Sequence, residues 1–364
     1  MIIREGNTKI FVPRNINIKR KGPLHKTPCF YNPALETDRD ICVLFCLYII
    51  DLGYDKFLDG MAATGVRGIR IANEAGGRVY INDWGEKQYK IIQKNIKLNN
   101  ISACISKKDL RILLLEKHNF DYIDIDPFGS PIPFIDSAIQ GSKRDSFMAF
   151  TATDKATLCG VYPLVCKRRY DAIPFHGDAM KEIGLRILIG CIARQTTRFE
   201  YGITPLLSYS TDHYFRTYIK ISKGIKNANE TLKNMGGAQK EKGTWRTGKN
   251  ISSIGPLWIG NIGDKNIIKE LIKRAQTKKL GKRWELDLIL KNLELEADAP
   301  PLYYESDRIA SKLHTCQPKM SDILQALRDN GFHAYKTHFS QKGIKTDAPY
   351  SHIKKIFIDQ KKLS

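Results

Sequence analysis

The segment Asp126 to Pro131 has the composition of a site that grips a flat, nitrogen-bearing ring. The Asp126 carboxylate and the Pro127 backbone carbonyl can each accept a hydrogen bond from an exocyclic NH2 group. The Phe128 ring can stack on the face of the same ring, and Gly129 permits the tight turn that a bulky base requires. These residue types predict an amino-directed methyltransferase that acts on a nucleobase.

The chemistry of such a reaction makes specific demands on Asp126. An exocyclic amino nitrogen is a weak nucleophile because its lone pair is delocalised into the ring, and Asp126 is suited to bind one N–H and later take the proton. Methyl transfer from a sulfonium needs no metal, because in-line positioning of donor and acceptor lowers the barrier. Guanine, adenine and cytosine all carry an amino group, and these residues alone do not choose among them. The competing reading makes Asp126 a loop entry and Phe128 a core residue.

Alternating strand and helix patterns between Leu52 and Ser222 favour the site. They predict an open, largely parallel sheet covered on both faces. Two further apolar-rich strands form a hairpin, which gives an α/β, Rossmann-like, mixed seven-stranded sheet of the class I S-adenosylmethionine-dependent methyltransferase type. The expected strands are Lys56 to Asp59, Arg78 to Asn82, Ala103 to Ser106, Phe120 to Asp126, Ser146 to Thr153, Ile203 to Ser210 and Tyr214 to Ile221.

Candidate cofactor residues follow the first three of these strands, where ligands of parallel sheets bind. The turn from Gly60 to Gly65 lets the backbone approach a ligand closely. Asp83 could hold ribose hydroxyls, and Asp109 with the Leu110 backbone could accept from an adenine amino group. Arg67 could meet the carboxylate of S-adenosylmethionine. Taken singly, these residues are also consistent with an ordinary turn, helix caps and a surface arginine. Their order along the chain favours S-adenosylmethionine as the cofactor. NAD is disfavoured because its G-x-G-x-x-G motif is absent from this turn.

The length and charge of the chain predict two domains and a nucleic-acid partner. The 364 residues carry a formal net charge of +21, which favours a polyanion over an unpartnered basic surface. Residues 226–364 contain 26 Lys and Arg against 15 Asp and Glu. We therefore predict two domains: a class I methyltransferase domain at 1–222, with an N-terminal extension at 1–50, and a smaller basic α+β nucleic-acid-binding domain at 223–364. Residues 236–253 are expected to form a loop.

The remaining composition argues for a reduced cytoplasmic protein. The eight cysteines form no C-x-x-C pair, so neither a disulfide framework nor a zinc site is expected. The first residues lack the apolar segment of a signal peptide, and no apolar run has the length of a membrane span.

Several motifs together resemble the tRNA (guanine-N2)-dimethyltransferases that modify guanine 26, particularly the archaeal members, over nearly the whole chain. The motifs are Phe30-Tyr31-Asn32-Pro33 with Arg39-Asp40, Ala63 to Arg70, Asn82-Asp83, Asp126 to Pro131, Thr151 to Asp154 with Leu158-Cys159-Gly160, and Gly255 to Gly260.

This resemblance implies transfer of one or two methyl groups from S-adenosylmethionine to N2 of guanine in tRNA, without a required protein partner. It implies that Asp126 is the catalytic acid residue and that 223–364 helps to dock tRNA. It also implies that the cofactor contacts come from Arg39, Arg67, Asp83, Asp109 and the Leu110 backbone.

One departure concerns metal. Many relatives carry a four-cysteine zinc knot before Gly255, whereas residues 236–253 have no cysteine, so we predict no zinc. Two alternative functions remain: an amino methyltransferase acting on DNA or another RNA, and a non-catalytic RNA-binding protein that keeps the methyltransferase fold.

Overall fold

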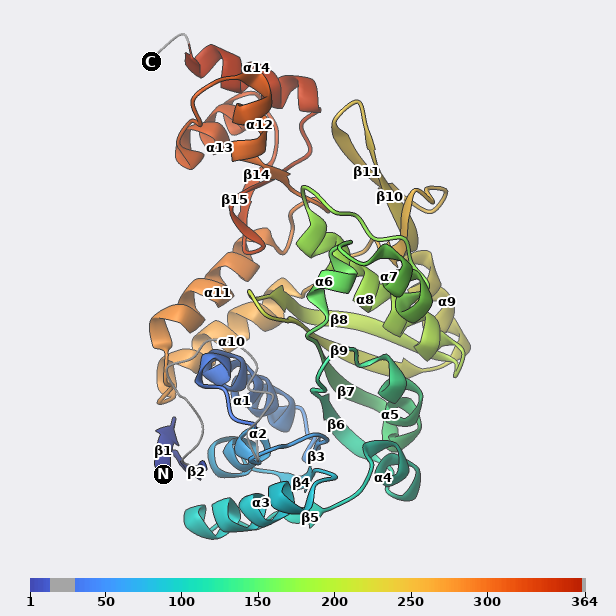
Figure 1. Ribbon diagram of the computed structural model, residues 1–364, viewed down its shortest axis with the longest axis vertical. Helices are drawn as coiled ribbons and strands as arrows, with labels where there is room; N and C mark the ends of the chain where they lie inside the picture. The colour runs from blue at the N-terminus through green and yellow to red at the C-terminus, as the bar shows by residue number, and fades with distance from the viewer. Residues whose placement is uncertain (14–29, 362–364) are drawn as a thin grey trace.

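A mixed seven-stranded sheet forms the centre of the computed structural model, which describes residues 1–13 and 30–361 (Figure 1). The strand order is β5-β4-β3-β6-β7-β9-β8, with β9 antiparallel to both neighbours and the other pairs parallel. The order confirms the fold class predicted from the sequence. The strands are β3 (Lys56–Asp59), β4 (Arg78–Asn82), β5 (Cys104–Ser106), β6 (Phe120–Ile125), β7 (Ser142–Ala152), β8 (Tyr201–Ser210) and β9 (Phe215–Lys223).

Both faces of the sheet are covered, which explains the apolar strands. All six residues of β6 are buried. Neighbouring strand residues point to opposite faces, so Tyr122 packs in one hydrophobic cluster and Ile123 in the other. A strand that contributes to two cores must be apolar on both sides, as β6 is apart from its acids.

Helices from distant parts of the sequence form the two covering layers (Figure 1). The cluster of Tyr122 includes residues of α1 (Glu36–Asp51), α2 (Val66–Arg70), α3 (Glu86–Asn99), α10 (Lys265–Thr277) and α11 (Arg283–Glu296). The cluster of Ile123 includes residues of α4 (Leu110–Glu116), α5 (Ile135–Gly141), α6 (Lys155–Leu158), α7 (Pro163–Tyr170) and α8 (Met180–Thr197). A π-helical turn, Ile71–Ala75, follows α2, and α9 (Ile225–Lys233) contacts β8.

The segment 236–253 is not the loop that the sequence predicts. It contributes to a three-stranded antiparallel sheet of β10 (Met235–Glu241), β11 (Thr244–Gly248) and β12 (Ile254–Trp258). Lys242 and Gly243 both have positive φ, 48° and 88°, so they form the two-residue turn that matches strand twist. The strands are mostly polar because they are only half-buried, which hid them from the apolar pattern.

The C-terminal region has a core of its own. Its elements are β13 (Tyr304–Glu305), β14 (Ala334–Thr337), β15 (Ser340–Thr346), α12 (Ser306–Leu313), α13 (Met320–Asp329) and α14 (Tyr350–Lys361). Their apolar side chains form a third cluster, whereas α10 and α11 belong to a cluster of the central sheet. The domain boundary at residue 223 therefore separates segments that share a core, and it stays a prediction.

The N-terminal residues form a hairpin of β1 (Ile2–Glu5) and β2 (Thr8–Phe11) against α3, where the Phe11 N–H donates to Asn95 Oδ1 at 2.6 Å. Part of the predicted N-terminal extension, residues 14–29, lies outside the described residues. Among the helices that the structure describes, none is long and apolar enough to cross a membrane.

Candidate active site

The turn after β3 brings the backbone close to its neighbours. The Gly60 N–H donates to the Asp124 carbonyl at 3.1 Å, and a Cβ on Gly60 would lie 2.9 Å from that oxygen. Gly65 precedes α2 with a φ of 78°, a conformation that favours glycine. The buried side chain of Leu110 packs against Gly60. The backbone thus requires glycine at both positions, as the sequence predicts. Contact of these glycines with a cofactor stays a prediction.

Asp83, after β4, is held by backbone groups of this turn. Its Oδ2 accepts from the Ala63 N–H at 2.8 Å, and its Oδ1 accepts from the Gly85 N–H at 3.1 Å. Burial raises the pKa of Asp83, and the backbone hydrogen bonds from Gly85 and Ala63 oppose that rise. Each carboxylate oxygen keeps a second lone pair that can accept a ligand hydroxyl.

Asp109, after β5, has a local role as the cap of α4. Its Oδ1 accepts from the Arg111 N–H at 2.8 Å, and the Arg111 guanidinium donates to both oxygens at 3.0 and 2.6 Å. The hydrogen bond from the Arg111 side chain is the main reason that the pKa of Asp109 lies below its usual value. Its predicted contact with adenine is untested by this geometry.

Asp126, after β6, is paired with an arginine of the neighbouring helix. Arg67 Nη2 donates to Asp126 Oδ2 at 2.7 Å and to Asp38 Oδ2 at 2.8 Å, and Arg67 Nε lies 3.6 Å from Asp124 Oδ1. The Arg67 side chain is buried, whereas a quarter of the Asp126 side chain is exposed. The alternative interpretation of Arg67 as a surface residue is therefore wrong.

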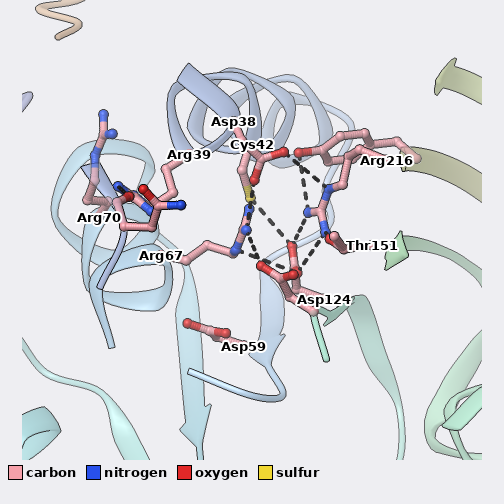
Figure 2. Close-up of polar contacts among 12 residues, drawn as sticks. Asp38, Arg39, Cys42, Asp59, Arg67, Arg70, Asp124, Thr151 and Arg216 are labelled. Atoms are coloured by element: carbon pink, nitrogen blue, oxygen red, sulfur yellow. Dashed lines mark hydrogen bonds and ion pairs between the residues drawn. The ribbon is translucent and has the colours of Figure 1, made fainter. Parts of the chain in front are cut away.

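A second buried arginine completes the network, and Figure 2 shows its side chain facing Asp124 from β9. Arg216 donates to the two oxygens of Asp124 at 3.1 and 2.5 Å and to Thr151 Oγ1 at 2.8 Å. Tyr122 also donates to Asp124, at 2.5 Å. Two arginines thus neutralise the acids beside the strand ends, as buried charges require.

The network controls the protonation of its acids. Burial acts to raise the pKa of Asp38, but the charges of Arg67 and Arg216 and a hydrogen bond from Tyr209 outweigh it and hold that pKa at about 2. Asp59, at the end of β3, forms no ion pair within the described residues, and the charge of Arg67 and the hydrogen bond from the Gly68 N–H only partly offset its burial. Burial, with repulsion from Asp124, raises the pKa of Asp59 to about 8.

Within the predicted corner, Phe128 is the exposed residue. Phe128 is 66% exposed, and its ring lies edge-on to Phe30 with 5.0 Å between centroids. The alternative interpretation of Phe128 as a core residue is therefore wrong. Pro127 itself is buried. The Gly129 N–H donates to Thr153 Oγ1 at 2.6 Å, and the Thr153 N–H donates back to the Gly129 carbonyl at 2.9 Å, which fixes this loop to the end of β7.

Arg39 lies in a buried cluster at the start of α1. It donates to Glu5 Oε1 at 2.5 Å and to Glu5 Oε2 at 2.8 Å, and to the Asn32 carbonyl at 3.0 Å. Tyr31 donates to the same carboxylate at 2.5 Å. The cofactor contact that the resemblance implies for Arg39 stays a prediction.

Sequence reasoning missed three residues of this site: Asp38, Asp124 and Arg216. Asp124 offered a signal, because an acid inside a strand of buried apolar residues requires a cation. The partner could not be identified, since Asp124 and Arg216 are 92 residues apart in the chain.

The sheet order and the acids that follow its parallel strands define a class I methyltransferase by fold. A model of the family "N2,N2-dimethylguanosine tRNA methyltransferase" matches residues 6–358. The chain belongs to this family, which confirms the resemblance seen in the sequence.

Individual relatives match over almost their full lengths. The tRNA (guanine(26)-N(2))-dimethyltransferase of Pyrococcus horikoshii is 35% identical over an alignment that covers 96% of this chain and 95% of the relative. That of Methanobrevibacter smithii is 36% identical, with 97% and 96% covered. The structure of Trm1 from Pyrococcus horikoshii with S-adenosyl-L-methionine superposes with a TM-score of 0.89, at 35% identity, over 98% of this chain and 99% of that one.

Proposed function

We propose that this chain transfers one or two methyl groups from S-adenosyl-L-methionine to N2 of guanine 26 in tRNA. The observation that carries the proposal is the position of Asp126. This acid follows a central strand, is partly exposed and is oriented by Arg67. The chain that presents it matches curated tRNA (guanine(26)-N(2))-dimethyltransferases over nearly its whole length.

The residues around the turn after β3 fit S-adenosyl-L-methionine. Arg67 Nη1 and Thr64 Oγ1 are buried and have no hydrogen-bond partner among the described residues. A buried donor without a partner costs free energy, so these atoms fit a site that a ligand carboxylate completes. Asp83 would hold the ribose, Asp109 and Leu110 the adenine, and Arg67 with Arg39 the methionine end.

The corner at the end of β6 would hold the guanine. When bound, S-adenosyl-L-methionine supplies an electrophilic methyl group on a sulfonium. Arg67 donates to Oδ2 of Asp126, so Oδ1 is left to accept one N–H of the amino group, without another partner in the described residues. The Pro127 carbonyl accepts the other N–H, and the exposed Phe128 ring stacks on the base. Asp126 then accepts the proton as positive charge develops on nitrogen.

The basic C-terminal part would help to dock the tRNA. Residues 226–364 have a large excess of cations, and those from 304 onward pack around a separate core. Contacts between these cations and the phosphates of tRNA would supply affinity that does not depend on the nucleotide sequence. We also propose that the enzyme works in the cytoplasm, without a protein partner, because its substrates meet there and the chain itself carries all the proposed groups.

Analysis of nucleosides tests this function. The purified chain alone, incubated with labelled S-adenosyl-L-methionine and a tRNA transcript, should yield N2-methylguanosine or N2,N2-dimethylguanosine by mass spectrometry. A transcript with adenine at position 26 should yield neither. Labelling of that control transcript, or of duplex DNA with equal efficiency, would contradict the proposal.

A further inference from the structure

One face of α7, close in sequence to the site, exposes apolar and basic groups together. Leu164, Lys167 and Arg168 are exposed and follow the i, i+3, i+4 spacing that puts them on one side of the helix. Cys166 and Tyr170, on the other side, are buried. Leu164 is 82% exposed, which is unusual for leucine on a helix that packs against the core.

The turn before the helix exposes an aromatic ring as well. Tyr162 is 56% exposed and Val161 is 49% exposed. The backbone of Tyr162 is fixed, because its carbonyl accepts from the Cys166 N–H at 3.0 Å in the first turn of α7. We call these five residues the α7 lip: Val161, Tyr162, Leu164, Lys167 and Arg168.

Hydrogen bonds join the helix of the α7 lip to the loop of Phe128. Gly129 exchanges two hydrogen bonds with Thr153. The next residue, Asp154, accepts from Tyr170 at 2.7 Å and from Arg169 at 3.2 Å, both on α7. The helix is therefore held in a fixed relation to the corner that would receive the base.

The charges of the α7 lip favour an anionic occupant. Lys167 lies 3.2 Å from Asp171, an exposed pair of little strength. Arg168 has neither a hydrogen bond nor an ion pair within the described part of the chain. A guanidinium of this kind and an exposed tyrosine, on one helix and the turn before it, are the groups that bind a phosphate and stack on a base.

We propose that the α7 lip binds the RNA strand next to the target guanine. This inference rests on the proposed function. A base that leaves its stack to reach the site deprives its neighbour of a stacking partner. Tyr162 would stack on that neighbouring base, Arg168 would contact its phosphate, and Leu164 would cover the apolar side of the ribose.

Binding of unmodified tRNA transcript, measured by fluorescence anisotropy at several salt concentrations, tests the proposal. Tyr162→Ala should raise the Kd about 5- to 150-fold, the range that loss of one stacked base gives, whereas Tyr162→Phe should stay within about twofold of wild type. Arg168→Ala should make the plot of log association constant against log salt concentration less steep, by about 0.7 to 0.9 in slope. Arg78→Ala, an exposed arginine at the start of β4, is the control that should change neither.

The outcomes separate the two proposals. If the wild-type protein leaves guanine 26 unmethylated, the proposed function fails. If it methylates guanine 26 but either Tyr162→Ala or Arg168→Ala binds tRNA like wild type, the α7 lip is overturned while the proposed function stands. Unchanged thermal unfolding and unchanged affinity for S-adenosyl-L-methionine would show that the variants are folded.

Discussion

Arg67 contacts three acids, from α1, β6 and the loop after β6, and this determines where Asp126 points. Its guanidinium lies between Asp38 of α1, Asp124 of β6 and Asp126 beyond that strand. Arg216 holds Asp124 from the other side with two hydrogen bonds. Because planar guanidinium groups bind carboxylates with fixed geometry, the partly exposed acid is kept in one orientation. Preorganisation of this kind is what a positioned proton acceptor needs.

The ribose assignment is tested at Asp83. Asp83→Ala should weaken the binding of S-adenosyl-L-methionine by about 10- to 100-fold, since hydrogen bonds to a charged group contribute about 1.5–3 kcal/mol. Calorimetric titration measures the change. Asp83→Asn, which can still accept from the Ala63 N–H, keeps the turn in place and should show a smaller loss.

The control for Asp83 is Asp145, an exposed acid within the first residues of β7, which should be replaceable by Ala without effect. An unchanged dissociation constant in Asp83→Ala would remove this residue from the cofactor site.

At the scale of single elements, some strands and hairpins could be predicted from the sequence and others could not. The apolar run of β6 and the hairpin of β8 and β9 were predicted because burial on two faces leaves a plain pattern. The hairpin of β10 and β11 was missed because its strands are polar, and a Lys-Gly turn is a weak indicator. Arg216 was missed because its alternation with apolar residues in β9 says nothing of its partner.

The joint between β3 and α2 gives a prediction about pH. Asp59 accepts from the Gly68 N–H at 2.8 Å, and burial raises its pKa to about 8. The folded state therefore binds this proton more tightly than the unfolded state does. The resulting stability is complete below the unfolded pKa, near 3.8, and is lost as the pH rises toward 8.

Asp59→Asn should remove this dependence, because the amide oxygen can still accept from Gly68 but carries no charge. Between pH 5 and pH 8 the free energy of unfolding of the wild type should fall relative to the variant, by at most about 1.4 kcal/mol per pH unit. Urea unfolding of both proteins at several pH values measures the difference. Parallel curves would show that Asp59 is ionised in the folded protein.

At the scale of the whole molecule, a buried charge cluster joins the C-terminal core to the central sheet. Lys345 of β15 lies 3.0 Å from Glu182 of α8 and 3.6 Å from Glu296 of α11. Burial acts to raise the pKa of Glu296, but the charge of Lys345 and hydrogen bonds from His338 and Thr337 outweigh it and hold that pKa below its usual value. His338 also accepts from the Ser210 N–H at 3.1 Å. The proposed tRNA-docking part is thereby fixed relative to the site.

Removal of the central cation should destabilise this joint. Lys345→Ala leaves buried carboxylates with one partner fewer and should lower the free energy of unfolding by about 3 kcal/mol. Lys342→Ala is the matched control in the same strand: its ammonium is exposed and lies 3.2 Å from Asp307, so its loss should cost less than about 1 kcal/mol. Denaturant unfolding compares them, and equal losses would contradict the role given to the cluster.

The most direct test of the central claim is the turnover of an Asp126 variant with tRNA at saturating S-adenosyl-L-methionine. Asp126→Asn keeps the size of the side chain but removes the charge that accepts the proton. It should lower kcat by at least about 100-fold while the Kd for S-adenosyl-L-methionine stays within about threefold of wild type. Asp136→Asn, at an exposed acid in the first turn of α5, should retain wild-type turnover. Turnover of Asp126→Asn within about threefold of wild type would contradict the account.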